Sequence, residues 1–271
     1  MGQKLSYYQL LSNDPVYIGI GHIKPPTVSE RRILGEHLWW QYIMYCSLTV
    51  DNYYQAFLKD KYDDFLSAPL EERKAVTLFD LLKYNEDVIS VFIEIFNFYF
   101  IENVDFDLNE RVFRIFNLKY TDSETLPDKE IVGFITGETF QDVLDIILQI
   151  SNVKLEKTAE DELSKVDDPV TLAWLKQREA AMKKRAPKKS TAKQDPKFDI
   201  GNIVSIVSAY GENGLNCLNI DNVTIPQLYD QLTRILIDRN YKIQARNVSI
   251  WGDENNEFQS DVYIKNINQE N

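Results

Sequence analysis

The sequence predicts an α+β, mainly α-helical fold, and three observations support this prediction. Long segments place apolar side chains three and four residues apart, which is the spacing of an amphipathic helix. Two capping boxes, which begin at Thr27 and Thr224, mark the starts of helices. Residues 104–119 instead change to a β-hairpin pattern around a turn, with a third strand expected at 130–136.

The chain divides into three expected parts. Residues 1–153 should form a mainly helical N-terminal domain that contains the β-hairpin or small sheet. Residues 154–197 should form a charged helix followed by a basic flexible linker, because Lys, Pro, Ser and Ala bury too little surface to offset chain entropy. Residues 198–271 should form a small, helical C-terminal domain. The chain has 271 residues, 44% of them hydrophobic, which is enough to supply a core.

The N-terminal domain begins with a predicted strand. Residues 16–23 are rich in β-branched side chains, and two prolines that cannot donate to a ladder follow them. Thr27 and Glu30 then form the capping box of a helix. Apolar residues recur along this helix at helical spacing, and Trp39 and Trp40 widen its apolar face.

Four more helices are expected in this domain. Residues 49–66 and 70–85 read as two amphipathic helices separated by a break. Residues 86–102 are apolar on nearly every side, which predicts the buried central helix of the domain. Residues 139–150 read as the helix that closes it.

The C-terminal domain should begin with the apolar segment at 198–210. The second capping box, Thr224 to Gln227, opens another helix with proline in its first turn, where the missing N–H costs nothing. We expect the chain to continue after Asn240 and to end in a polar, strand-like piece at 261–265. The apolar positions of the helix that Thr224 opens follow helical spacing: Ile225, Leu228, Tyr229, Leu232, Ile235 and Leu236.

Charge is distributed unevenly along the chain. The formal net charge is −12, yet residues 183–197 carry about +6 and the remainder about −18. An acidic body repels nucleic acid, and the basic run lacks the interleaved aromatic residues on which bases stack. The basic run therefore reads as a solubilising linker or as a segment that docks on an acidic protein surface.

The expected compartment is reducing and cytosolic. Cys46 and Cys217 lie far apart in apolar stretches, as inert small hydrophobes do, which excludes a disulfide framework. Residues 1–11 lack the continuous apolar segment of a signal peptide. No run reaches the roughly 18 apolar residues of a membrane span, so no membrane partner is expected.

No catalytic, cofactor-binding or metal-ligating residue is predicted, and the chain is not expected to be an enzyme. His22 and His37 lack partners at metal-ligand spacing. The glycines at 19 and 21 lack the third glycine and the following helix of a phosphate-binding loop. Acidic pairs such as 63–64, 71–72 and 167–168 fit solvated surfaces better than Mg²⁺ sites.

Two segments resemble a known family. His22-Ile-Lys-Pro-Pro-Thr-Val, followed by Ile33-Leu-Gly-Glu-His, is similar to a signature near the N-terminus of tail assembly chaperone-like proteins of tailed bacteriophages from Gram-positive hosts. Thr224-Ile-Pro-Gln-Leu-Tyr-Asp-Gln, with Trp251-Gly downstream, is similar to a helix near their C-terminus. The quoted motifs contain 22 of the 271 residues, about a twelfth of the chain.

The resemblance implies a factor that keeps the phage tape measure protein soluble in the host cell cytoplasm until the tail tube protein polymerises around it. It implies no catalytic residue and no cofactor. Protein binding of this kind uses large aromatic and aliphatic surfaces, often a helix lying in a groove. The candidate partner-binding residues are Trp39, Trp40, Tyr229 and Trp251.

Three other hypotheses remain open. A structural virion protein of the tail or connector is the main alternative. An enzyme or nuclease without a recognisable motif rests only on the acidic pairs, and a small regulatory or anti-defence binder has no specific support. The oligomeric state is open as well.

Overall fold

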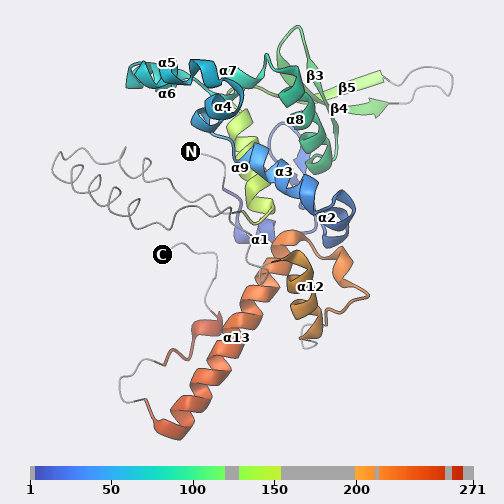
Figure 1. Ribbon diagram of the computed structural model, residues 1–271. Helices are drawn as coiled ribbons and strands as arrows, with labels where there is room; N and C mark the ends of the chain where they lie inside the picture. Colours follow the sequence, from blue (N-terminus) through green and yellow to red (C-terminus); the bar gives the residue numbers. More distant parts are fainter. Residues whose placement is uncertain (1–3, 120–127, 154–198, 211–213, 254–257, 265–271) are drawn as a thin grey trace.

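The computed structural model describes residues 4–119, 128–153, 199–210, 214–253 and 258–264 (Figure 1). The predicted mainly helical α+β fold is confirmed: helices dominate, and two small antiparallel sheets accompany them. The predicted charged helix and basic linker at 154–197 lie outside the described residues.

The first sheet is a short hairpin and not the single strand expected at 16–23. After α1 (Tyr7–Leu10), β1 (Val16–Tyr17) and β2 (His22–Ile23) pair antiparallel. Gly19 reverses the chain with a φ of 89°, a conformation that glycine adopts without steric cost. The β-branched residues were read correctly, whereas the glycine turn between them was missed.

The predicted capping box at Thr27 is confirmed. Its hydroxyl accepts from the backbone N–H of Glu30, whose carboxylate accepts from the backbone N–H of Thr27 in return. This box starts α2 (Val28–Leu34), and Gly35, with a φ of 85°, separates it from α3 (Glu36–Cys46). The expected single helix is therefore two.

The two helices expected at 49–66 and 70–85 are also divided. The chain forms α4 (Val50–Phe57), a 3-10 turn η1 (Lys59–Lys61), α5 (Tyr62–Ser67), α6 (Leu70–Ala75) and α7 (Leu78–Leu82). An N-terminal cap at Thr77, whose hydroxyl accepts from the N–H of Asp80, starts α7 separately from α6.

The predicted central helix is confirmed as α8 (Glu86–Tyr99), three residues shorter than expected. Asn85 caps its N-terminus, and six of its apolar side chains are buried. Its rings join those of the sheet and of α9 (Phe140–Ile150) in an aromatic core, with Phe96 and Phe113 5.0 Å apart and Phe92 and Phe140 5.2 Å apart between ring centroids.

The predicted hairpin and third strand form the second sheet. It consists of β3 (Asn103–Asp107), β4 (Val112–Lys119) and β5 (Asp128–Ile135), antiparallel and in that order. One face of the sheet packs on the aromatic core, where Phe113 and Ile115 are fully buried.

The C-terminal part contains α12 (Ile200–Ala209), a 3-10 turn η3 (Ile220–Asn222), α13 (Ile225–Trp251) and a 3-10 turn η4 (Val262–Ile264). The capping box at Thr224 is confirmed. α13 has 27 residues and continues without a break past Asn240. The strand expected at 261–265 is wrong, because residues 262–264 form a 3-10 turn.

The start of α13 is attached to the N-terminal part. Tyr7 donates its hydroxyl proton to Asp230 at 2.5 Å, and the amide nitrogen of Gln227 donates to the carbonyl oxygen of Leu11 at 2.7 Å. Arg32 pairs with Asp221 at 2.6 Å. Buried side chains of both described parts belong to one contiguous core. The division into domains at 1–153, 154–197 and 198–271 stays a prediction.

Candidate protein-binding surface

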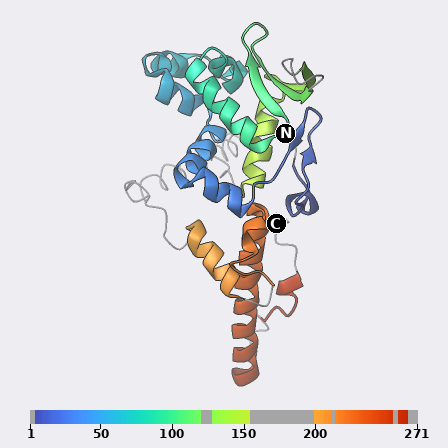
Figure 2. The same ribbon diagram turned by 90° about the vertical axis from the view of Figure 1, so that its right-hand side faces the viewer.

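α13 has one half in contact with the body and one half that projects from it. Ile225, Leu228, Leu232 and Ile235 in the first half are all buried. Figures 1 and 2 both show the second half extending away from the helices and sheet of the N-terminal part. Within the described part of the chain, the helices and sheet of the N-terminal part therefore do not cover this half.

Apolar side chains nevertheless continue along the projecting half. Leu236, Ile243 and Ile250 are spaced seven residues apart, which places them within about 40° of one another around a helix of 3.6 residues per turn. Their exposed fractions are 48%, 59% and 57%, and that of Trp251, at the end of the helix, is 80%. We call these four residues the α13 stripe.

Other sides of the projecting half are partly covered. The ring of Tyr241 lies 5.5 Å from that of Phe258, and Asp238 accepts hydrogen bonds from Tyr210 of α12 and from Lys242. Asp238 and Tyr241 thus face α12 and the segment that ends in η4. Neither contact covers the α13 stripe.

The candidate residues named from the sequence do not converge on one surface. Trp39 is only 1% exposed and lies in the core, where its ring stacks under the guanidinium of Arg31 at 4.5 Å. Trp40 is 37% exposed and donates its indole N–H to Glu36 at 2.5 Å. Trp39 therefore offers no surface to a partner.

The other two candidates lie on α13. Tyr229 is half-buried near the start of the helix, and Trp251 is exposed at its end. Leu236 is predicted from the sequence only as a helix-face residue, and Ile243 and Ile250 are not among the predicted binding residues. The available signal is the exact seven-residue spacing of all three, although Ile237, Tyr241, Ala245 and Val248 also lie in this segment.

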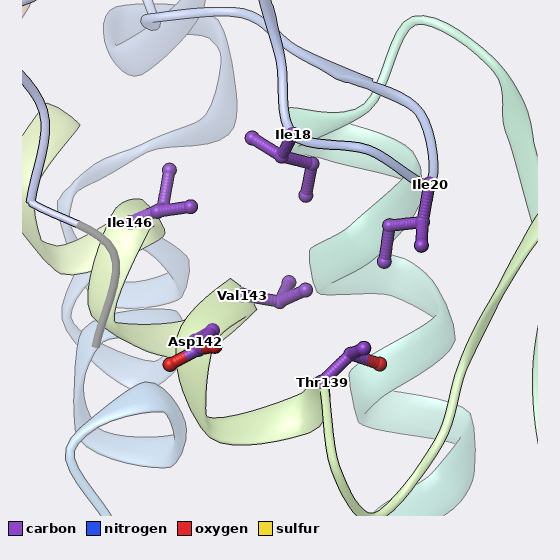
Figure 3. A pocket seen from close by; sticks show the side chains of 6 residues that line it. All are labelled: Ile18, Ile20, Thr139, Asp142, Val143 and Ile146. Atoms are coloured by element: carbon purple, nitrogen blue, oxygen red, sulfur yellow. The ribbon is translucent and has the colours of Figure 1, made fainter. Parts of the chain in front are cut away.

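A small pocket lies between the β1–β2 turn and α9. Figure 3 shows Ile18 and Ile20 of the turn around the same space as Val143 and Ile146 of α9, with Thr139 and Asp142 below them. Its volume of about 50 Å³ is far below the several hundred Å³ of a small-molecule site. Val143 and Ile146 are buried and Ile18 and Ile20 are half-buried, so the pocket is a small hollow between packed aliphatic side chains.

One histidine, His22, has a carboxylate partner. The ring Nδ1 of His22 lies 2.7 Å from Glu102 Oε1, and its backbone N–H donates to Oε2 at 3.0 Å. Although burial acts to raise the pKa of Glu102, these hydrogen bonds hold it below its ordinary value. The pair joins β2 to the end of α8.

The thiols differ in exposure. Cys46 is buried as expected, and burial raises the pKa of its thiol far above the ordinary value. Cys217 is exposed, which corrects the expectation that it packs as a small hydrophobe.

Within the ranges that the structure covers, no three His, Cys, Asp or Glu side chains are grouped to hold a metal ion. No described helix is both long and apolar enough to cross a membrane.

The fold and surface define a mainly helical α+β protein with an apolar stripe on a projecting helix. Residues 189–268, which include α12 and α13, match the model of a phage-like family described as the YomV second domain. The match covers less than half of the chain and suggests a phage protein. No curated protein and no solved structure matches the chain.

Proposed function

We propose that this chain is a protein-binding assembly factor, a tail assembly chaperone that keeps the phage tape measure protein soluble during tail morphogenesis. It would act in the host cell cytoplasm. The observation that carries the proposal is the α13 stripe, four large apolar side chains left exposed on a projecting helix. The phage-like family match over the same region supports it.

The stripe suits helix-to-helix recognition. A client helix with apolar residues at positions i, i+3, i+4 and i+7 packs its apolar face against such a stripe and so withdraws it from water. Leu236, Ile243 and Ile250 are already about half covered, so burying the rest of each contributes about 1 kcal/mol, and the more exposed Trp251 contributes somewhat more. After the entropy cost of association, this leaves weak and reversible binding, as a factor that releases its client requires.

Co-expression with the tape measure protein encoded nearby tests the proposal. The wild-type chain should raise the soluble fraction of the tape measure protein and coelute with it on size exclusion. The double variant Ile243→Asp/Ile250→Asp should lose both effects, because two carboxylates then interrupt the stripe. If the tape measure protein is equally soluble with and without the wild-type chain, the proposal is wrong.

A matched control separates the stripe from a general loss of surface hydrophobicity. Leu218 and Ile33 are 93% and 81% exposed and lie outside α13. The double variant Leu218→Asp/Ile33→Asp makes the same kind of change in charge and apolar surface. It should retain the effect of the wild-type chain on the tape measure protein.

Purified phage particles separate this proposal from the alternative of a structural virion protein. A tail or connector component is present in many copies per particle, whereas an assembly factor is nearly absent. Quantitative mass spectrometry of particles therefore distinguishes the two functions. A stoichiometric amount of this chain would support the structural alternative.

A further inference from the structure

Two arginines lie along one edge of the α13 stripe. Arg239 and Arg246 each lie three residues after one apolar stripe residue and four residues before the next, so they line one side of the stripe. Asn240 and Asn247 line the other side. All four side chains are exposed.

The two arginines are available to a partner. Across the described residues neither guanidinium forms an ion pair, whereas the neighbouring Lys242 is paired with Asp238 at 2.8 Å. Seven residues of helix separate the two charges by roughly 10 Å along the axis. The chain as a whole carries a net charge of −12, so this basic edge contrasts with the acidic protein around it.

We propose that the α13 stripe takes an amphipathic helix whose apolar face is edged by carboxylates about two turns apart. This inference rests on the proposed function, because it names the chemistry of the client. The apolar stripe supplies the area, and Arg239 and Arg246 form charge-assisted, bidentate hydrogen bonds with the client carboxylates. The uncharged edge formed by Asn240 and Asn247 makes the site asymmetric and so fixes the direction of the client helix.

A second copy of α13 fits the site less well. In a parallel pair of α13 helices, Arg239 of one copy lies beside Arg239 of the other, and the same holds for Arg246. These like charges repel. In an antiparallel pair centred on Ile243, the arginines face Asn247 and Asn240, which offer no carboxylate. The charges of the site thus favour an acidic client over self-association.

Two designed helical peptides provide the test with the full-length chain. They share one apolar pattern and one length, and they carry either Glu or Lys along the edges of the apolar face. Fluorescence anisotropy at low salt should show the Glu peptide binding at least about tenfold tighter, with the difference shrinking as salt rises. General attraction to an acidic protein predicts the opposite order.

Three variants assign the binding to this site. Arg239→Glu/Arg246→Glu should reverse the preference between the two peptides, and Ile243→Asp/Ile250→Asp should weaken binding of the Glu peptide about tenfold or more. The matched reversal Lys59→Glu/Lys61→Glu, on the exposed turn η1, should leave the preference unchanged. It controls for charge change remote from α13.

The inference is overturned if neither peptide binds, if both bind equally, or if the preference survives Arg239→Glu/Arg246→Glu. The last result would assign the attraction to the basic run at 183–197. A chain that solubilises the tape measure protein yet shows no peptide preference would retain the proposed function without this inference. A chain that prefers the Glu peptide but does not affect the tape measure protein would retain the docking site and lose the function.

Self-association is a separate outcome of the same experiments. If light scattering shows a dimer that Ile243→Asp/Ile250→Asp dissociates, and the Glu peptide does not compete with it, a second copy occupies the stripe and the inference fails.

Discussion

Thr27 and Thr224 face each other as an isolated antiparallel β-bridge, and each residue also caps its own helix. The backbone N–H of Val28 donates to the carbonyl of Val223 at 2.9 Å, and that of Ile225 donates to the carbonyl of Pro26 at 2.8 Å. The starts of α2 and α13 are thus joined back to back. This junction sets the direction in which the projecting half of α13 leaves the body.

Replacing either threonine by alanine should destabilise the protein by about 1 kcal/mol, since each side chain accepts from an early backbone N–H that has no partner within its helix. Thr224 is only 1% exposed, so water cannot replace its hydroxyl in Thr224→Ala. Urea unfolding measures the loss. Thr233→Ala is the control, because its exposed hydroxyl only bonds back to the carbonyl of Tyr229 and alanine favours the helix.

The double variant Thr27→Ala/Thr224→Ala tests whether the two helix starts act together. Residues in direct contact give coupled effects, so the free-energy change should differ from the sum of the single changes by about 0.5 kcal/mol or more. Strict additivity would mean that each cap stabilises only its own helix and that the bridge contributes nothing.

Gly133 of β5 lies directly against the β1–β2 turn. A Cβ at this position would lie 2.3 Å from the carbonyl oxygen of Ile20 and 2.8 Å from its Cα. Because both are backbone atoms, the β1–β2 turn would have to shift. Gly133→Ala should therefore cost about 1–3 kcal/mol, measured by urea unfolding.

Gly137→Ala is the matched control for this prediction. Its Cβ would meet only a ring carbon of Phe79 at 3.5 Å, an ordinary van der Waals distance. A loss in Gly137→Ala as large as that in Gly133→Ala would show that the contact with Ile20 is not the cause.

The pair formed by His22 and Glu102 should make stability depend on acid pH. The folded-state pKa of Glu102 is lowered from its ordinary value of 4.5, so the unfolded chain binds the proton more readily. The contribution of Glu102 to folding stability is complete above its ordinary pKa and is lost as pH falls through its folded-state pKa. Glu102→Gln should cost about 1–3 kcal/mol at pH 7 and progressively less toward pH 3.

Urea unfolding from pH 7 to pH 3 checks this prediction. Glu110→Gln provides the comparison, because Glu110 is exposed in the β3–β4 turn. The assignment would be refuted if the stability difference between wild type and Glu102→Gln stayed constant over this range.

Strong local patterns predicted the elements that the structure confirms. α8 was predictable because an all-round apolar segment is stable only inside a core, and both capping boxes form as read. The helices at 49–66 and 70–85 were read as too long, because their breaks lie within continuous periodicity. The Thr77–Asp80 cap was the available signal for one of those breaks.

The candidate surface was only partly predictable. Trp39 and Trp40 are adjacent, so they point about 100° apart on α3, and a sequence with apolar residues on both sides does not show which ring is buried. The sequence pattern predicts the helix only as far as Leu236, because the apolar residues of the projecting half do not continue the same face. Its exposure depends on where the first half docks, and the junction of Thr27 with Thr224 brings together residues too distant in sequence to pair by pattern.

Replacing the buried Trp39 should lower the free energy of unfolding far more than replacing the exposed Trp251. Trp39→Ala leaves a cavity in the core and removes the ring under Arg31, so the loss should be about 3–5 kcal/mol. Trp251→Ala should change stability by no more than about 0.5 kcal/mol, because its side chain is 80% exposed. Urea unfolding gives both values.

Binding measurements test the role of the exposed Trp251 ring, because a ring that does not stabilise the fold can instead contact a partner. Trp251→Ala should weaken complex formation with the proposed client, the tape measure protein, severalfold while the fold stays intact, because the ring lies at the end of the α13 stripe. Trp40→Ala, which removes a ring of 37% exposure outside α13, should leave that affinity unchanged. Equal losses in the two variants would show that the binding surface extends beyond α13 to α3.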